Sequence, residues 1–268
     1  MDAHVSEIYR YPIKSCKGHQ LKYATLDRFG ITGDRRWMIV DDRGKFVTQR
    51  QLARLTTLVP ESHSDGIIIT HQKSSIEIKF EHLSERRCAT VWQDDITVLD
   101  AGDKASKWLS EKVNKSLRLV YMPDDCHRLV DKHYAKKDQT VSFADGFPIL
   151  LTTQSSLDLL NSRLFSPVSM DRFRPNIVIT GCDPHEEDNW KTIRIGAVEF
   201  EVVKSCSRCV IPSIDQMTGD KNNEVLERLR EYRLGEDKRI YFGQNLLYKH
   251  NADSPSKISV GDVVEIIS

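Results

Sequence analysis

The sequence has no excess of charge of either sign and no long apolar run. Lys and Arg together number 39, as do Asp and Glu, so the formal net charge at neutral pH is zero. A balanced charge excludes a protein held on nucleic acid or on an anionic membrane by bulk attraction. No stretch approaches the roughly 18 apolar residues that a membrane helix needs. We therefore expect no nucleic-acid partner and no membrane.

Cysteines are too few and too irregularly spaced for a secreted disulfide scaffold, since only six occur, at 16, 88, 126, 182, 206 and 209. The N-terminus lacks the cationic start and the apolar run of a secretory signal. The sequence also contains no P-loop and no Gly-x-Gly-x-x-Gly dinucleotide fingerprint. These absences predict a soluble, cytoplasmic protein whose thiols are reduced.

Most periodic segments are short, rich in β-branched or aromatic residues and bounded by Gly, Asp, Asn or Pro, which is typical of β-strands. The expected strands are Val5–Tyr11, Arg36–Val40, Lys45–Gln49, Gly66–His71, Ile76–Phe80, Ala89–Trp92 and Ile96–Leu99, with turns at 41–44 and at Asp94-Asp95. Helical spacing is convincing in three segments, which are Asp103–Asn114, Thr153–Leu164 and Asn223–Arg233. The pattern predicts a mostly β (α+β) fold, a barrel or sandwich of antiparallel strands with a few covering helices.

Local signals refine the helices and the domain organisation. We expect Thr153 to cap the second helix, and Glu224 to pair with Arg228 on the third. A division near residue 120 predicts two domains, 1–120 and 121–268. The polar loop that follows it, Pro123–Asp138, is long enough to suggest a functional role, and it carries His127 and His133.

The sharpest chemical motif is Cys206-Ser207-Arg208-Cys209, which follows an expected strand. A redox dithiol would need a helix N-terminus, and a zinc site would need two further ligands, so the flanking residues favour neither. A third interpretation is that one cysteine is a soft thiolate ligand to a metal that a cofactor supplies. In that case Arg208 would help to hold the Cys209 sulfur as the thiolate. A pair of small buried residues without chemistry is the remaining alternative.

Three further clusters could bind an anion, although each alone is also explained by an ordinary surface turn or salt bridge. Lys14 and Ser15 end the first strand with an ammonium, a hydroxyl and free backbone N–H groups. Asp34 and Arg35 open another strand as a charged pair. The segment 172–176 supplies guanidinium groups and an amide, which suit a planar anionic ligand.

Taken together and in order, the motifs resemble the MOSC family, and within it the mitochondrial amidoxime reducing component and its bacterial relatives. They are Tyr11-Pro-Ile-Lys-Ser-Cys-Lys-Gly18, Gly33-Asp-Arg-Arg-Trp37, Thr48-Gln-Arg50, Ser142-Phe-Ala-Asp-Gly146, Phe173-Arg-Pro-Asn176 and Cys206-Ser-Arg-Cys209 with Asp215 and Thr218-Gly219. The resemblance covers the whole chain, and it implies a β-rich N-terminal MOSC domain packed on a MOSC β-barrel domain.

The resemblance implies a molybdenum cofactor, a pterin dithiolene that carries a phosphate. Cys209 matches the family's metal ligand. The positions that match or flank cofactor contacts are Lys14, Ser15, Arg35, Arg174, Asn176, Ser207 and Arg208. The implied activity is reduction of N-hydroxylated compounds, namely amidoximes, hydroxylamines and N-hydroxylated bases. Asp145, together with His127 and His133, is a candidate proton donor.

The chain has no cysteine after Cys209, so we expect no iron–sulfur cluster within it. Electrons would then come from a separate flavin or iron–sulfur reductase, or from a fused domain of a longer protein. Two other functions stay open. One is a sulfur carrier for cofactor sulfuration that holds a persulfide on Cys206 or Cys209, and the other is a non-catalytic cofactor-binding module.

Overall fold

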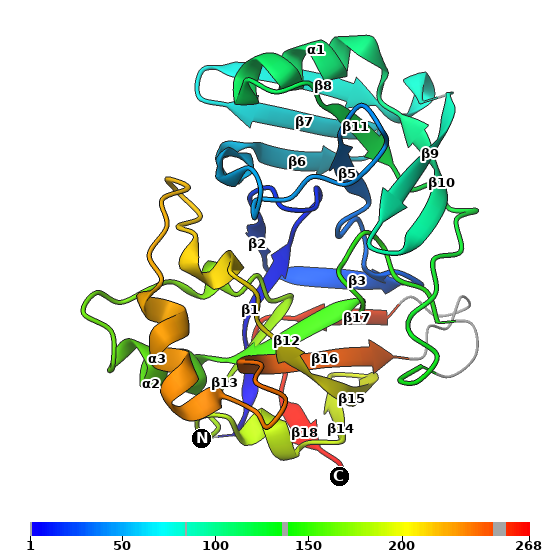
Figure 1. Ribbon diagram of the computed structural model, residues 1–268. Coiled ribbons are helices and arrows are strands. Elements are labelled where there is room, and N and C mark those ends of the chain that lie inside the picture. The colour runs from blue at the N-terminus through cyan, green and yellow to red at the C-terminus, as the bar shows by residue number, and fades with distance from the viewer. Residues whose placement is uncertain (1, 84, 136–138, 249–255) are drawn as a thin grey trace.

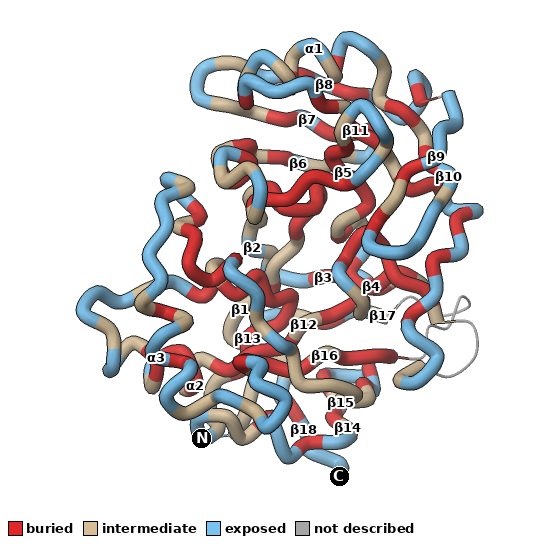
Figure 2. The backbone as a smooth tube through the Cα atoms, in the orientation of Figure 1, coloured by how far each residue is buried: buried red, intermediate tan, exposed pale blue. Residues whose placement is uncertain are grey.

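The computed structural model describes residues 2–83, 85–135, 139–248 and 256–268, which form two lobes stacked one above the other (Figure 1). The chain is mostly β, as the sequence predicted, with three α-helices in the described residues. Buried backbone runs through both lobes and through the region where they meet, whereas exposed residues concentrate on the peripheral loops and turns (Figure 2).

The lower lobe is built on an eight-stranded sheet with the strand order β18-β14-β15-β16-β12-β13-β1-β2. Its strands are β1 (His4–Arg10), β2 (His19–Leu21), β12 (Ile149–Thr153), β13 (Ile177–Thr180), β14 (Thr192–Ile195), β15 (Val198–Ser207), β16 (Tyr241–Tyr248) and β18 (Val264–Ile266). Neighbouring strands are antiparallel, except that β12 and β13 are parallel. A three-stranded sheet shares its core and contains β3 (Tyr23–Asp27), β4 (Gly30–Ile31) and β17 (Ser256–Ser259).

The upper lobe contains two smaller sheets and one helix. The four-stranded sheet contains β5 (Trp37–Val40), β9 (Arg86–Val91), β10 (Asp94–Asp100) and β11 (Arg118–Tyr121). The three-stranded sheet contains β6 (Val59–His63), β7 (Gly66–His71) and β8 (Ser74–Lys79). Helix α1 (Gly102–Val113) buries Ala105, Leu109 and Val113 against these strands, which is the apolar stripe that its periodicity predicts.

Helices α2 (Gln154–Asn161) and α3 (Glu224–Arg233) pack on the lower lobe, where Leu157 and Leu229 join one apolar cluster. The Thr153 hydroxyl accepts the Ser156 N–H, so the predicted N-cap is confirmed. The predicted pair of Glu224 with Arg228 is wrong. Arg228 pairs with Glu231 at 2.8 Å, and the Glu224 carboxylate instead accepts the backbone N–H of Phe165.

The strands were predicted better than their turns. The segments expected at 5–11, 36–40, 66–71 and 76–80 form β1, β5, β7 and β8 with shifts of one or two residues. The turn expected at Asp94-Asp95 is wrong, because Asp94 already pairs with Val91 in the ladder. The chain turns two residues earlier, at Trp92 and Gln93, where Trp92 has a φ of 57°. Lys45–Gln49 forms isolated bridges rather than a strand.

The two lobes do not follow a single cut in the sequence. Strands β1 and β2 belong to the eight-stranded sheet of the lower lobe, and β3 pairs with β17 near the C-terminus. The division expected near residue 120 falls inside β11. The chain therefore starts in the lower lobe, crosses to the upper lobe and returns, so residues distant in the sequence meet between the lobes.

Glu187 is a buried carboxyl group in the lower lobe, on the 3₁₀ turn Glu186–Asn189. The Thr153 hydroxyl donates to one of its oxygens at 3.1 Å, and the Ser156 hydroxyl lies 3.3 Å from the other. Burial raises the pKa of Glu187 to about 7, which exceeds its ordinary value of 4.5. The folded state therefore holds this proton more tightly than the unfolded state does.

This raised pKa predicts a loss of stability as pH rises. The contribution is fully present below the unfolded pKa and disappears as pH rises through the folded value of about 7. In Glu187→Gln, the free energy of unfolding should lack this decline, which is about 3 kcal/mol in the wild type. Urea denaturation between about pH 5 and pH 8 measures it. The exposed control Glu199→Gln should keep the wild-type decline, and an equal decline in Glu187→Gln would contradict the prediction.

Candidate functional site

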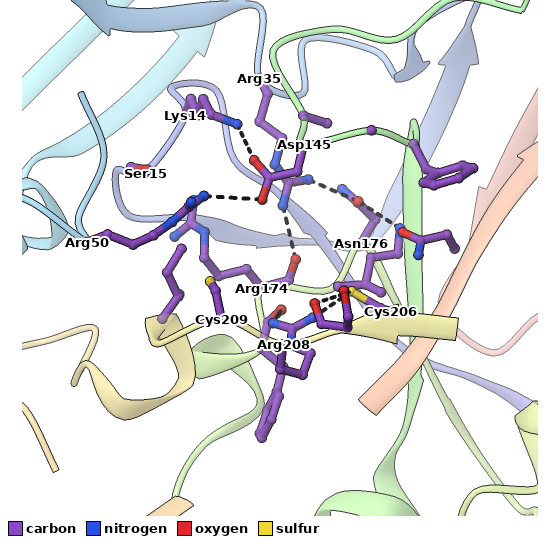
Figure 3. A pocket seen from close by; sticks show the side chains of 18 residues that line it. Lys14, Ser15, Arg35, Arg50, Asp145, Arg174, Asn176, Cys206, Arg208 and Cys209 are labelled. Atoms are coloured by element: carbon purple, nitrogen blue, oxygen red, sulfur yellow. Dashed lines mark hydrogen bonds and ion pairs between the residues drawn. The ribbon is translucent and has the colours of Figure 1, made fainter. Parts of the chain in front are cut away.

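A cavity of about 120 Å³ lies where the two lobes meet (Figure 3). All of the predicted metal-ligand and cofactor-binding residues line it, together with Asp145, namely Lys14, Ser15, Arg35, Asp145, Arg174, Asn176, Ser207, Arg208 and Cys209. These residues come from five separate stretches of the chain. His127 and His133 are not among the lining residues.

Three of the lining residues have left-handed backbone conformations that side chains disfavour. The φ angles are 67° at Ser15, 47° at Arg35 and 55° at Arg174. Each such residue costs on the order of 1–3 kcal/mol unless its surroundings hold it. Backbone hydrogen bonds do so here, since the Arg35 N–H donates to Tyr11 and the Arg174 N–H donates to Asp171. The fold thus accepts strain where side chains must point into the cavity.

Lys14 connects the two sides of the cavity. It follows β1, and its Nζ donates to the Phe143 carbonyl at 2.7 Å and to the Asp145 carboxylate at 2.5 Å. Burial lowers the pKa of Lys14 to about 8, although Asp145 opposes the shift. Arg50 contacts the other oxygen of Asp145 at 3.5 Å, and its guanidinium lies 4.7 Å from the centre of the Trp92 ring.

Asp145 is ionised in this arrangement. Burial alone would raise the pKa of its carboxyl group, but Lys14 and then Arg50 lower that pKa well below its usual range. A carboxylate with a low pKa holds no proton at neutral pH. In this structure, therefore, Asp145 acts as a counter-ion, and the proton-donor role expected for it gains no support.

Arg35 is held from both lobes. Its guanidinium donates to Asp34 at 2.6 Å, to the Asn176 side-chain oxygen at 3.0 Å and to the Arg174 carbonyl at 3.0 Å. Asp34 is only 1% exposed, so this is a buried ion pair and not the ordinary surface pair that the sequence also allowed. Asn176 further accepts the Leu150 N–H, and its amide is therefore used mainly to position Arg35 and the strands.

Arg174 is a cation in the cavity whose hydrogen-bonding capacity is only partly used. Its guanidinium lies 4.2 Å from the centre of the Tyr11 ring, and Nη1 contacts Gln216 at 3.3 Å. Burial lowers the pKa of Arg174 to about 10, so it stays charged at neutral pH. Its Nη2 is buried without a partner among the described residues. Arg50 and Arg208 each bury an Nε atom in the same condition, which leaves three donors suited to an anion.

The two cysteines at the end of β15 differ in their surroundings. Arg208 donates to the Cys206 sulfur at 3.1 Å and to the Phe173 carbonyl at 2.7 Å. The expectation that Arg208 holds the Cys209 thiolate is therefore wrong in this structure, because its guanidinium turns back toward Cys206. Cys209 is exposed and lines the cavity. No group of three His, Cys, Asp or Glu side chains in the described residues could hold a metal ion by itself.

Sequence reasoning assigned no role to several residues that the cavity contains. Arg50 belongs to the motif Thr48-Gln-Arg50, and its positive charge was the signal that could have marked it as a site residue. Asn245 carried no local signal, because it reaches the cavity only through the pairing of β16 with β15. Phe147 and Phe173 supply apolar lining and read simply as core residues in the sequence.

Comparisons with known proteins agree with this architecture. Residues 2–116 match the MOSC N-terminal beta barrel domain, and residues 138–265 match the MOSC domain. The chain is 31% identical to mitochondrial amidoxime-reducing component 1 of Homo sapiens over 280 residues, which cover 98% of this chain and 82% of that protein. The chain belongs to the MOSC family.

Two further relatives show the range of proteins that contain this unit. Mitochondrial amidoxime-reducing component 1 of Danio rerio is 34% identical over 247 residues, covering 87% of this chain and 76% of that protein. The molybdenum cofactor sulfurase of Homo sapiens is 32% identical over 284 residues, covering 97% of this chain but 32% of the sulfurase. None of the helices that the structure describes is long and apolar enough to cross a membrane.

The unpartnered Nη2 atom predicts that Arg174 is needed for anion binding more than for folding. Arg174→Ala should lower the content of bound cofactor in purified protein by about tenfold, because a charge-assisted hydrogen bond is lost. Molybdenum analysis measures this, and a thermal melt checks folding. Arg194→Ala, which removes an exposed arginine paired with Glu265, is the control. Full occupancy in Arg174→Ala would remove this residue from the site.

Proposed function

We propose that the chain binds a molybdenum cofactor in the cavity between its lobes and reduces N-hydroxylated compounds with it. The observation that carries the proposal is the convergence of one exposed cysteine, Cys209, with five cations in a single cavity. MOSC domains bind the molybdenum cofactor, and the relatives named above include amidoxime-reducing components.

The residues present fit an anionic cofactor with a soft metal. Lys14, Arg35 and Arg174 would bind its phosphate, and the unpartnered Nε atoms of Arg50 and Arg208 supply two further donors. The set of residues that bind the cofactor would be completed or supported by Ser15, Asn176, Ser207 and Arg208. Cys209 would be the protein's ligand to the metal, because a thiolate is a soft, strongly donating ligand for a high-valent metal that cycles between two oxidation states.

When bound, the cofactor would supply the two-electron redox chemistry of the reaction. Cleavage of an N–O bond consumes two electrons and two protons, and the oxygen leaves as water. The chain's own contribution is to bind, orient and partly enclose the reactants. Phe147 and Phe173 give the cavity an apolar side against which a substrate can pack.

The two cysteines provide the most direct test. Cys209→Ala should lower the rate of amidoxime reduction by roughly 100-fold or more, since it removes a metal ligand. Cys206→Ser should keep most of the activity, because Arg208 can donate to a hydroxyl as it does to sulfur. Initial rates with reduced viologen measure both. Equal losses in the two variants would instead indicate a dithiol.

Electron supply gives a second test. The chain has no dinucleotide fingerprint and no cysteine after Cys209, so we propose that electrons come from a separate flavin or iron–sulfur donor or from a fused domain of a longer protein. The purified chain should not turn over with NADH or NADPH alone, and it should do so with an artificial donor or an added reductase. Steady turnover with NADH and this chain alone would contradict the proposal.

The expected cytoplasmic location also stays a prediction, since two of the relatives above are named as mitochondrial.

Sulfur transfer is a second candidate function, and two observations favour it. About a third of a cofactor sulfurase matches this chain. In addition, Arg208 contacts the Cys206 sulfur, and that contact would stabilise a thiolate or persulfide. A carrier would release cysteine-bound sulfur on treatment with cyanide and would not reduce amidoximes. The reductase should show the opposite behaviour, and a pure binding module should show neither.

A further inference from the structure

Among the described residues that line the cavity, Asp145 is the only one with a carboxylate, whereas Lys14 and four arginines line it as well. It contacts Lys14 at 2.5 Å and Arg50 at 3.5 Å. An anionic ligand that approaches these two cations therefore meets a site in which one negative charge is already present.

The carboxylate lies on the solvent side of the cations that it neutralises. The Asp145 side chain is 58% exposed, while the Lys14 side chain is 6% exposed and that of Arg50 is 23% exposed. Asp145 thus covers the two cations, and a ligand must replace it to reach them.

The Asp145 side chain can leave without movement of the backbone. The Arg128 guanidinium donates to the carbonyl groups of Ser142, Ala144 and Asp145 at 2.6–3.1 Å, and this fixes the segment. The neighbouring Gly146 borders open space, since no atom lies within 4 Å of an added Cβ. Because this backbone is held and the Asp145 side chain is exposed, we expect rotation of that side chain alone to free Lys14 and Arg50.

We propose that Asp145 is a displaceable counter-ion that selects the charge of the ligand: a dianion such as a phosphate group replaces it, and a monoanion does not. Exchange of a carboxylate for a monoanion leaves the charge balance unchanged, whereas a dianion adds one attractive charge against the remaining cations. The inference rests on the anion-binding part of the proposed function and does not depend on the reaction.

Sulfate and nitrate test this selection, since they carry two charges and one charge at any pH near neutrality. Each is titrated calorimetrically into the full chain freed of cofactor, at low salt and at about pH 6, where Lys14 stays protonated. The wild type should bind sulfate at least about tenfold more tightly than nitrate. Asp145→Asn should bind nitrate at least about tenfold more tightly than the wild type does, and it should also bind sulfate more tightly, because neither anion then has to displace a carboxylate.

Two variants serve as controls. Asp145→Glu keeps the negative charge and should keep the wild-type preference for sulfate. Asp125→Asn removes an exposed carboxylate that pairs with Arg86 outside the cavity, and it should also behave as the wild type. Thermal melts establish that each variant is folded.

The outcomes separate this inference from the proposed function. Nitrate binding that is no tighter in Asp145→Asn than in the wild type would overturn the inference alone, as would equal binding of the two anions by the wild type. Weaker sulfate binding in Asp145→Asn would show that Asp145 helps to hold the ligand, and it would overturn the inference too. If neither protein bound sulfate, the anion-binding part of the proposed function would also fail.

Discussion

Positive charge concentrated between two lobes is the constraint on which the rest of the structure depends. Lys14 and Arg35 both precede β5 in the sequence. Lys14 contacts the segment that leads into β12, and Arg35 contacts the segment that leads into β13. Buried cations repel one another and lose hydration, so each needs a fixed partner or a ligand. Asp34, Asp145 and backbone carbonyls supply part of that compensation, and the unpartnered nitrogens of Arg174, Arg50 and Arg208 mark where it is incomplete.

The path of the chain makes this concentration possible. Because β1 and β2 pair within the lower sheet, the stretch that carries Lys14 leaves that sheet directly beneath the upper lobe. Cys209 follows the end of β15, far from Lys14 in the sequence, and it lines the same cavity. Left-handed backbone at Ser15, Arg35 and Arg174 then directs the side chains inward. This arrangement suits a cofactor that brings its own metal, since the described protein residues offer a thiolate but no complete metal site.

Short-range patterns in the sequence predicted most of the elements, and the order of the motifs pointed to many of the cavity residues, but neither predicted the contacts among them. Alternation of apolar residues is a local signal, so β1, β5 and β7 were found, and motif order grouped Lys14 with Cys209. The turn was wrongly predicted at Asp94-Asp95 because contacts elsewhere in the fold hold these residues in the strand: Asp94 pairs with Arg128 at 2.8 Å, and Asp95 accepts from Thr90 at 2.6 Å. For the same reason no local pattern could show that Arg208 contacts Cys206, that Asn176 supports Arg35, or that Asp145 is already ionised against Lys14.

The central claim is that the cavity holds molybdenum through one protein thiolate, that of Cys209. X-ray absorption at the molybdenum edge of the purified chain tests it most directly, because the spectrum counts the sulfur neighbours of the metal. Replacement of Cys209 by serine should leave the metal with one sulfur neighbour fewer, while the Cys206→Ser spectrum should match that of the wild type. A protein without molybdenum, or a sulfur neighbour lost on replacement of Cys206 instead, would contradict the assignment.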